Sequence, residues 1–279
     1  MILLNNLKSK FFNFLPSILQ SLINNLRFLP DYLTFLLNPK GSKKFDKVFL
    51  NKKNKYKGCR CVIIGNGPSL KDMDLSILKN EHTIGLNRIY LIFKELGFNT
   101  DYLVAINRLV IEQFSNELES VESYKLFNWK YRKYFLSDSE IAFSVSRPMK
   151  MKGNLSKGFY GFHGTVANVA IEFAYYLGFD EIILIGIDHN WRAKGEPDKE
   201  IQSEVNDSDH FHPDYFGKGV SWQLPNYKKL EFGYKASNDF ILSKNKIIVD
   251  ATKNGKLQIF KKVALESYLK KSNFRNKVK

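Results

Sequence analysis

The stretch Cys61-Val-Ile-Ile-Gly-Asn-Gly-Pro-Ser-Leu70 decides how this chain of 279 residues folds. Its apolar first part is typical of a buried parallel strand, and the two glycines that follow predict a tight turn. Such a turn at the carboxyl end of a parallel strand lets backbone amides approach a phosphate. The third glycine of the dinucleotide fingerprint is missing, because Leu70 follows Ser69. The stretch therefore predicts a nucleotide site but argues against plain NAD binding.

Strand and helix patterns alternate along the chain after this turn. Strand patterns cover 61–64, 83–86, 102–106, 181–185 and 246–249, weaker ones cover 124–127 and 141–145, and helical patterns cover 71–78, 89–96, 109–118, 166–177 and 226–242. This alternation predicts an α/β fold with a doubly wound, mostly parallel, Rossmann-like sheet. The segment 189–225 is long, polar and rich in His and aromatic residues. Because long loops in compact domains are usually functional, we expect it to form a lid over the carboxyl edge of the sheet.

The net charge of +15 belongs to the two ends of the chain. Residues 1–60 hold 12 Lys/Arg and 2 acids, residues 256–279 hold 8 and 1, and the middle, 61–255, holds 23 and 25. Nucleic-acid binding would favour basic residues spread along a binding face, so we expect no nucleic-acid partner. Basic ends fit attraction to an anionic membrane surface better.

The N-terminal segment strengthens the membrane interpretation. Apolar residues between Phe11 and Leu26 recur at helical spacing, which predicts either an interfacial amphipathic helix or a helix packed on the main domain or a partner. No window approaches about 18 uninterrupted apolar residues, and no signal-peptide pattern is present, so neither a membrane span nor a secretory signal is expected. We therefore expect a cytoplasmic protein, peripheral on the inner face of the cytoplasmic membrane.

Composition also divides the chain. Residues 38–57 are polar and Lys-rich and are interpreted as a linker, which gives a basic helical extension over 1–57, a nucleotide-binding catalytic domain over 58–265 and a basic tail over 266–279.

The only cysteines, Cys59 and Cys61, are too close in sequence for a good disulfide and too few for a zinc site. We expect them to be reduced.

Polar residues follow the predicted strands at the edge where ligands bind in open parallel sheets. They are Gly65-Asn66-Gly67, Asn87-Arg88, Asn107-Arg108 and Gly186-Ile187-Asp188, joined by the helix start His163-Gly164-Thr165. Asparagine can donate to and accept from ribose hydroxyls and a base edge. It is also common in turns and helix caps, so each of the three could instead have a local structural role.

Taken in order, these residues resemble the bacterial sialyltransferases of glycosyltransferase family 42. The sequence is more similar still to the group that contains the motility accessory factor proteins and the MptE-like 6-hydroxymethylpterin diphosphokinases. The string His210-Phe-His-Pro-Asp-Tyr-Phe-Gly-Lys-Gly219, with Trp222, Pro225 and the stretch 250–257, is typical of members from surface-polysaccharide gene sets. The resemblance covers roughly residues 58–265.

The resemblance implies a CMP-sugar site that needs no metal. Asn66 would lie near the donor phosphate with Gly65, Gly67 and Ser69, and Asn87 and Asn107 would contact ribose, phosphate or sugar. Gly164 and Thr165 would present amides, and Asp188 would lie by the cytidine and ribose. From their positions in the sequence, we expect His189 to line the pocket, while His163 opens a helix and could either join the pocket or act in capping or packing.

An inverting transfer needs a base with a pKa near neutrality, and histidine is the natural choice. We predict His210 as this base, with His212 as the second candidate, and Tyr215, Lys218 or Arg192 as donors to the leaving phosphate. The two histidines could instead join Asp207, Asp209 or Asp214 in a metal site, or be structural.

Three functions remain open at this stage. The leading one is a membrane-associated glycosyltransferase of bacterial surface-glycan synthesis, with a CMP-activated sialic acid-like or Kdo-like donor, a glycan or lipid-linked acceptor and no cofactor. The second is a 6-hydroxymethylpterin diphosphokinase using ATP and Mg²⁺, which Asp188, Asp207 and Asp209 could hold. The third is a non-catalytic, membrane-anchored nucleotide-binding protein. The basic, Phe-rich N-terminal extension favours the first.

Overall fold

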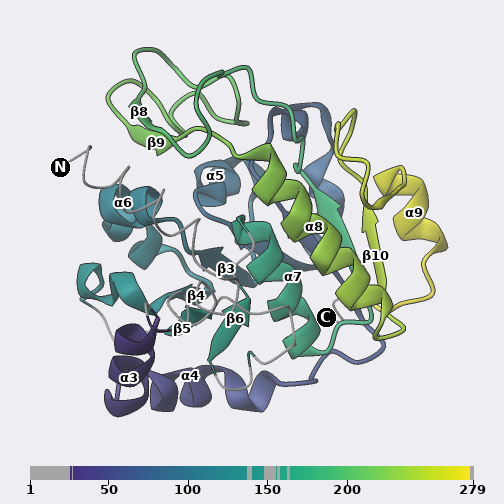
Figure 1. Cartoon of the computed structure of the whole chain (residues 1–279). Helices are drawn as coiled ribbons and strands as arrows, with labels where there is room; N and C mark the ends of the chain where they lie inside the picture. The colour runs from purple at the N-terminus through teal and green to yellow at the C-terminus, as the bar shows by residue number, and fades with distance from the viewer. Residues whose placement is uncertain are drawn as a thin grey trace, which may run out of the picture.

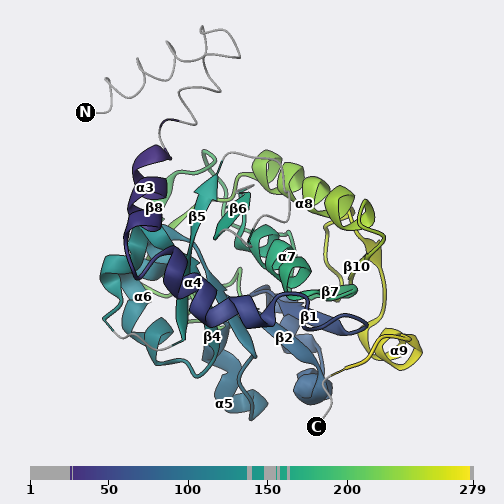
Figure 2. The same ribbon diagram turned by 90° about the horizontal axis from the view of Figure 1, so that it is seen from below.

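A computed structural model describes residues 26, 28–136, 140–147, 155, 158–161 and 164–276. The sheet strands are β1 Arg60–Ile64, β2 His82–Leu86, β3 Tyr102–Ala105, β4 Tyr124–Asn128, β5 Ile141–Arg147, β6 Phe159–Gly161, β7 Glu181–Ile185, β10 Ile247–Asp250 and β11 Lys261–Lys262. The helices are α3 Leu29–Leu37, α4 Ser42–Phe49, α5 Phe93–Leu96, α6 Arg108–Ser120, α7 Val166–Leu177, α8 Tyr227–Leu242 and α9 Leu265–Lys271. Figure 1 shows their arrangement, and Figure 2 shows the same ribbon from below.

The described strands build one nine-stranded sheet in the order β11-β10-β7-β1-β2-β3-β4-β5-β6. Every neighbouring pair in it is parallel. The chain runs outward from β1 to β6 and then returns to place β7 on the other side of β1. This confirms the predicted doubly wound α/β fold. The direction of winding reverses between β1 and β7, and open α/β sheets bind ligands at such a switch point.

The central strands and α7 form the middle of the core. All residues of β1, β3 and β7 are buried, as near-continuous apolar runs in a parallel sheet require. Helix α7 packs over β1, β2 and β3, and nearly its whole surface is buried. The hydroxyl of Thr165 caps its first turn, and Gly178, at φ 98°, ends it in the left-handed conformation. This fixes the start of α7 beside the ends of β1 and β7.

The interpretation of residues 38–57 as a linker is wrong. Helix α4 lies in this segment and packs against β5, with Phe45 and Phe49 almost completely buried. These two rings are four positions apart, so they share one face of a helix whose other face carries the lysines. The Lys-rich composition concealed this amphipathic pattern. The helix expected between Phe11 and Leu26 lies, apart from Leu26, outside the described residues.

Two shorter elements also differ from expectation. The helix predicted over 71–78 is a pair of 3₁₀ turns, Pro68–Asp72 and Leu75–Asn80. The chain after residue 265 forms α9, and Arg275 then pairs with Cys59 next to β1. Both cysteines are free and buried.

The segment 189–225 contains a small antiparallel pair, β8 Glu200–Gln202 and β9 Ser221–Gln223, at the top of Figure 1.

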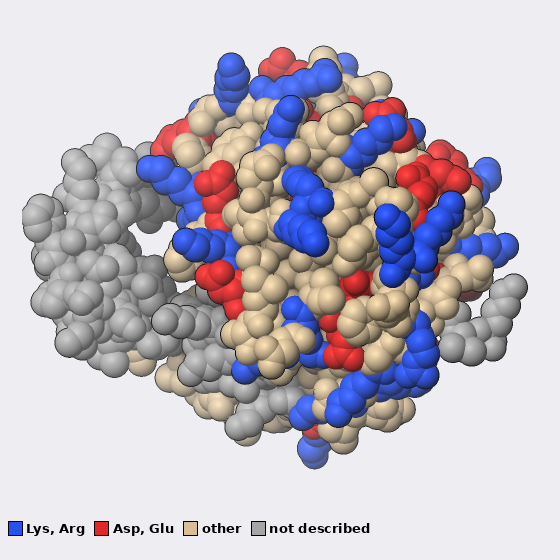
Figure 3. All heavy atoms as spheres, turned by 90° about the vertical axis from the view of Figure 1, so that its right-hand side faces the viewer, with Lys and Arg blue, Asp and Glu red and all other residues tan. Residues whose placement is uncertain are grey.

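The described parts of the two basic ends pack at opposite edges of the sheet. Helices α3 and α4 lie against β5, whereas β11 and α9 lie at the other edge (Figure 1). Figure 3 views this second edge and shows Lys and Arg side chains spread over it with acidic side chains between them. None of the described helices is long and apolar enough to cross a bilayer.

Candidate functional site

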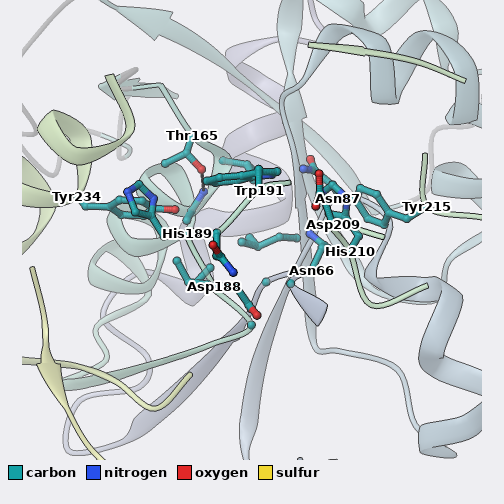
Figure 4. Close-up of a pocket in the computed structure, with 18 residues that line it drawn as sticks. Asn66, Asn87, Thr165, Asp188, His189, Trp191, Asp209, His210, Tyr215 and Tyr234 are labelled. Atoms are coloured by element: carbon teal, nitrogen blue, oxygen red, sulfur yellow. Dashed lines mark hydrogen bonds between the residues drawn. The ribbon is translucent and has the colours of Figure 1, made fainter. Parts of the chain in front are cut away.

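Two connected cavities open at the switch point of the sheet. The small cavity, of about 130 Å³, lies between the ends of β1 and β7 and the start of α7 (Figure 4). The large cavity, of about 660 Å³, extends from it past the ends of β3 and β4 toward α3. Both are lined by a shared set of side chains: Asn87, Thr165, Val166, Trp191, His210 and Tyr215. The two cavities are therefore one cleft with a common boundary.

The glycine turn after β1 forms the floor of the small cavity. The amides of Gly65 and Gly67 donate to the carbonyls of Ile185 and Gly186 over 2.8 and 2.9 Å. A Cβ on Gly65 would lie 2.3 Å from the Gly186 oxygen, so only glycine permits this approach. These amides are already engaged, which differs from the expectation that the turn cradles a phosphate. The glycines act here by bringing the ends of β1 and β7 together.

Asp188 locks this contact. Its carboxylate accepts from the amide and the hydroxyl of Ser69, over 2.9 and 2.7 Å. A Cβ on Gly67 would lie 1.7 Å from the same carboxylate, which explains the second glycine. Burial raises the pKa of Asp188 despite the Ser69 bonds, and the charge of Asp250 adds to the rise. Asp188 and Ser69 both belong to the site, but they bind each other.

The asparagines at the strand ends divide into two groups. The side-chain oxygens of Asn66 and Asn87 are buried and have no hydrogen-bond partner among the described residues, although both residues line the small cavity. Asn87 also has φ 48°, a conformation that Asn tolerates better than most residues. Asn107 instead caps α6 by accepting from the amide of Val110, while it borders the large cavity. Asn66 and Asn87 are therefore the two with free capacity for a ligand.

The start of α7 points at the cleft. Thr165 and Val166 line both cavities, and the Thr165 hydroxyl accepts from the amide of Ala167 over 3.3 Å. Gly164, at φ 84°, lies against the backbone of Lys229 and borders the large cavity. The partial positive charge of a helix N-terminus favours an anion at this position. His163 lies outside the described residues.

His210 is held at the boundary of the two cavities by a buried carboxylate. Its Nδ1 lies 2.7 Å from Asp207, which also accepts from the amides of Asp209, His210 and Phe216. Burial alone would raise the pKa of Asp207, but the His210 hydrogen bond and charge, with these amides, hold it below its usual value. The imidazole stacks on Tyr215 with ring centres 4.0 Å apart. Sequence reasoning named Asp207 only as a candidate metal ligand and missed its pairing with His210.

Arg88 clamps the loop that carries His210, and sequence reasoning did not single it out. It is almost completely buried, and its guanidinium donates to the carbonyls of Asp214 and Tyr215 and lies 3.5 Å from the Phe114 ring centre. A bond from the amide of Phe211 to the Asn66 carbonyl ties the same loop to the glycine turn. Position alone, directly after Asn87 at a strand end, was the available signal.

His189 and Asp209 also line the small cavity. His189, at φ 53°, packs edge-on against Trp191 and lies 3.2 Å from Glu231, and its Nδ1 is buried without a described partner. Asp209 accepts from the backbone amides that follow Trp191. In Figure 4, Trp191 lies between His189 and the group formed by Asp209 and Asn87.

Tyr215, His212 and Lys218 are further predicted catalytic or phosphate-binding residues. Tyr215 is buried beneath His210, and burial raises its pKa, although a hydrogen bond with Asn87 acts in the opposite direction. It therefore remains protonated. His212 accepts from the amide of Asp214, and neither it nor the exposed Lys218 lines either cavity.

The residues proposed as Mg²⁺ ligands do not fit a metal site as arranged. Asp188 is bound to Ser69, Asp207 to His210 and backbone amides, and Asp209 to backbone amides. Within the part of the chain that the structure describes, no three His, Cys, Asp or Glu side chains gather in a way that could hold a metal ion.

Comparisons with known proteins give a family match and a similar solved structure. No curated protein matches the sequence. Among solved structures, the chain is similar to the MAf glycosyltransferase from Magnetospirillum magneticum AMB-1, with a TM-score of 0.49 and 14% identity over 84% of this chain. This chain spans 39% of the length of that protein. The family model for 6-hydroxymethylpterin diphosphokinase MptE-like proteins matches residues 37–194, which is more than half of the sequence. The chain therefore belongs to the MptE-like family.

Proposed function

We propose that this chain is a glycosyltransferase of bacterial surface-glycan synthesis. It transfers a sialic acid-like or Kdo-like sugar from a CMP-sugar to a hydroxyl of a glycan or lipid-linked acceptor. The observation that carries the proposal is the Asp207–His210 pair, held 2.7 Å apart where the two cavities meet. A buried carboxylate that fixes the imidazole is the arrangement expected of a general base.

The proposed chemistry follows from which nitrogen of the His210 ring is hydrogen-bonded to Asp207. When Nδ1 of His210 donates its hydrogen to Asp207, Nε2 is left as the proton acceptor. In the transfer, the acceptor hydroxyl gives its proton to Nε2 and its oxygen bonds to the anomeric carbon of the sugar. The bond from that carbon to the donor phosphate breaks, and CMP leaves with the electron pair. Asp207 stabilises the imidazolium formed in this step.

The charge of the small cavity supports a donor with one phosphate. No Lys or Arg is among the described residues that line it, and its two carboxylates, Asp188 and Asp209, are bound to the protein. A triphosphate such as ATP requires metal ions or several cationic side chains. A single phosphate can be stabilised by the amides at the start of α7. The unpartnered oxygens of Asn66 and Asn87 would accept from ribose hydroxyls or the cytosine amino group.

The cavity sizes favour a donor that crosses the boundary. Pockets for small molecules usually measure about 300–1,000 Å³. The small cavity, at about 130 Å³, is below this range, whereas the large one, at about 660 Å³, lies within it. The nucleotide would enter the small cavity and the sugar would pass His210 into the large cavity, where the acceptor would bind.

A binding screen tests the nucleotide. Thermal shifts are measured with CMP, CDP, UDP, GDP and ATP, each with and without Mg²⁺. We expect a shift with CMP that does not depend on Mg²⁺. A shift only with Mg²⁺ and ATP would overturn the proposal in favour of the diphosphokinase activity for which the family is named.

Turnover tests the base. Release of CMP from CMP-N-acetylneuraminate and CMP-Kdo is measured in the presence of glycan acceptors. Loss of a general base typically lowers a rate by about 10²–10⁴-fold, and we expect this of His210→Ala, with CMP binding retained. His212→Ala is the matched control and should be close to wild type. If neither change alters turnover of either donor, the catalytic assignment is wrong.

A further inference from the structure

Helix α3 has two apolar faces. Its inner face packs on the sheet edge, where Phe35 is fully buried and its ring lies 5.5 Å from that of Trp129. The outer face carries exposed leucines at helical spacing: Leu29, Leu33, Leu36 and Leu37. Together with Leu26, which precedes the helix, they are here called the leucine stripe, and they are between 42% and 82% exposed. Twelve large hydrophobic side chains are exposed in the described part of the chain, and five of them form this stripe. A helix with two apolar faces normally buries both, so the stripe indicates a partner.

The elements that pack against α3 are rich in basic residues. The 3₁₀ turn η5, Trp129–Tyr134, packs against α3, where the indole of Trp129 donates to the Thr34 hydroxyl over 3.0 Å. Together α3, α4 and η5 contain two acidic residues, Asp31 and Asp46, and six basic ones: Lys43, Lys44, Lys47, Lys130, Arg132 and Lys133. The surface thus combines exposed leucines with an excess of positive charge.

We infer that α3 and η5 form a docking surface for an anionic lipid bilayer. Leucines that enter the interface, flanked by lysines and arginines that face lipid phosphates, are the features by which a helix lies on a membrane. A second copy of the chain fits less well, because a self-complementary contact would bring the basic residues of the two copies together. Bilayer phosphates offer the opposite charge.

The docking surface borders the large cavity. Asp31 in α3 and Lys130 and Tyr131 in η5 line this cavity, together with Phe28 directly before α3. Chain elements that touch the bilayer would therefore also form the mouth of the cleft that ends at His210. This part of the inference rests on the proposed function. It narrows the acceptor to a glycan carried on lipid, which the bilayer presents to the cleft from the side of α3.

The basic edge in Figure 3 provides the comparison surface. Lys261 and Lys270 are exposed there, on β11 and α9, at the edge of the sheet opposite α3. Among the described residues of these two elements, none is an exposed large hydrophobic side chain. If lipid binding depended on charge alone, this edge would also bind anionic lipid. If it depends on charge together with exposed leucines, binding is expected at α3 and η5.

Vesicle flotation of the full chain separates the two surfaces. Vesicles contain either phosphatidylcholine alone or phosphatidylcholine with phosphatidylglycerol. We expect binding to the anionic vesicles, and a loss of about tenfold or more for Leu33→Asp with Leu36→Asp, because two exposed leucines that would enter the bilayer are replaced by charges that lipid phosphates repel. The pair Lys130→Gln and Lys133→Gln should weaken binding by about threefold or more. The matched controls, Leu242→Asp with Val205→Asp and Lys261→Gln with Lys270→Gln, should bind like wild type. Unchanged binding of the leucine and η5 variants, or loss only with the Lys261 and Lys270 pair, would overturn the inference.

A fluorescent label tests direct contact. An environment-sensitive fluorophore is attached at Leu36→Cys or, as control, at Leu242→Cys, since both native cysteines are buried. Anionic vesicles should shift the emission to the blue only for the label at residue 36. Sedimentation of the Leu33→Asp and Leu36→Asp variant is measured without lipid. A change from dimer to monomer, with vesicle binding intact, would assign the stripe to self-association instead. CMP binding is measured in the same variants without vesicles, so failure of docking and failure of the proposed donor give different results.

Discussion

The cleft has two walls that are held together in different ways. The strand-end wall consists of Gly65–Ser69, Asn87 and Gly186–Asp188, and backbone hydrogen bonds between strand ends hold its centre. The loop wall, Asp207–Phe216, contains no regular element, and buried side chains hold it: Arg88 from outside the loop and Asp207 from within. The first wall follows from the sheet, since parallel strands must end at one edge. The second depends on a few polar side chains, each of which is buried and must be satisfied.

The family match separates the same two regions. It covers residues 37–194, which include the strand-end wall and end before the loop wall. The residues that we propose to perform the chemistry, His210 and Asp207, thus lie outside the matched span. The shared region contains the sheet edge at which open α/β sheets bind ligands, and different loops placed over such an edge can support different reactions.

The largest predicted effect is a loss of stability caused by a substitution in the strand-end wall. In Gly65→Ala, the new Cβ would lie 2.3 Å from the backbone oxygen of Gly186 and 2.6 Å from the Ile187 side chain. Backbone cannot yield as a flexible side chain can, so we expect the free energy of unfolding to fall by about 3 kcal/mol or more. Urea unfolding followed by circular dichroism measures the change. Gly97→Ala is the control, because its φ is 69° but its Cβ would meet nothing within 4 Å. It should cost only about 1–2 kcal/mol of backbone strain. Equal losses in the two variants would contradict the close approach of β1 and β7.

The next largest effect is a loss of stability caused by removing the guanidinium that holds the loop wall. Arg88→Met replaces the arginine with a long, unbranched side chain that has no guanidinium. The carbonyls of Asp214 and Tyr215 then lose their Arg88 donor. Unpaired buried carbonyls should cost about 2 kcal/mol, and hydrogen exchange should rise across 207–216 with little change in β1 and β7. Arg108→Met is the matched control at the next strand end. Its guanidinium is 40% exposed and pairs with Glu112 and Glu200, so the loss should be below about 1 kcal/mol. Uniformly faster exchange in Arg88→Met would contradict a local clamp.

The sequence predicted the strand-end wall because its signals are local. Apolar runs ending in Gly or Asn mark strand ends, and parallel topology then brings Asn66, Asn87 and Asp188 to one edge without further information. The same signals could not show that Asp188 binds Ser69, since that contact joins residues far apart in the chain. The role of Arg88 was missed for this reason too. Asp207 is only three residues from His210, but both lie in a loop without the regular spacing that would reveal their contact. Helix α4 was missed because two phenylalanines among lysines carry a weak apolar pattern, although both rings are buried.

A smaller effect distinguishes the asparagines. Asn107→Ala removes the cap of α6 and should lower the free energy of unfolding by about 1 kcal/mol, with CMP binding nearly unchanged. Asn66→Ala removes an oxygen without a described partner, so unfolding should change little. On the proposed donor, CMP binding should weaken by about tenfold, which corresponds to one lost hydrogen bond. Calorimetric titration with CMP and urea unfolding measure both variants. The reverse pattern would show that Asn66 is structural and Asn107 binds the ligand.

The smallest effect concerns acid, and the two walls should respond with opposite signs. The pKa of Asp207 is below its usual value, because the hydrogen bond and charge of His210 outweigh burial. Its unfolded form therefore binds protons first, and its contribution to stability is lost as the pH falls through the folded pKa. The pKa of Asp188 is raised, chiefly by burial. Its folded form binds protons first, so acidification between its unfolded and folded pKa values stabilises the fold.

Substitution of each aspartate turns this difference into a measurement. Urea unfolding is recorded from about pH 6 to pH 3, the range in which aspartates titrate, for wild type, Asp207→Asn and Asp188→Asn. The stability of wild type relative to Asp207→Asn should shrink as the pH falls, whereas its stability relative to Asp188→Asn should grow. Asp46→Asn, on the exposed face of α4, serves as the control for loss of a surface charge. Parallel curves for the two site variants would mean that His210 does not hold the charge of Asp207. The proposed pairing of Asp207 with a base at His210 would then lose its electrostatic support.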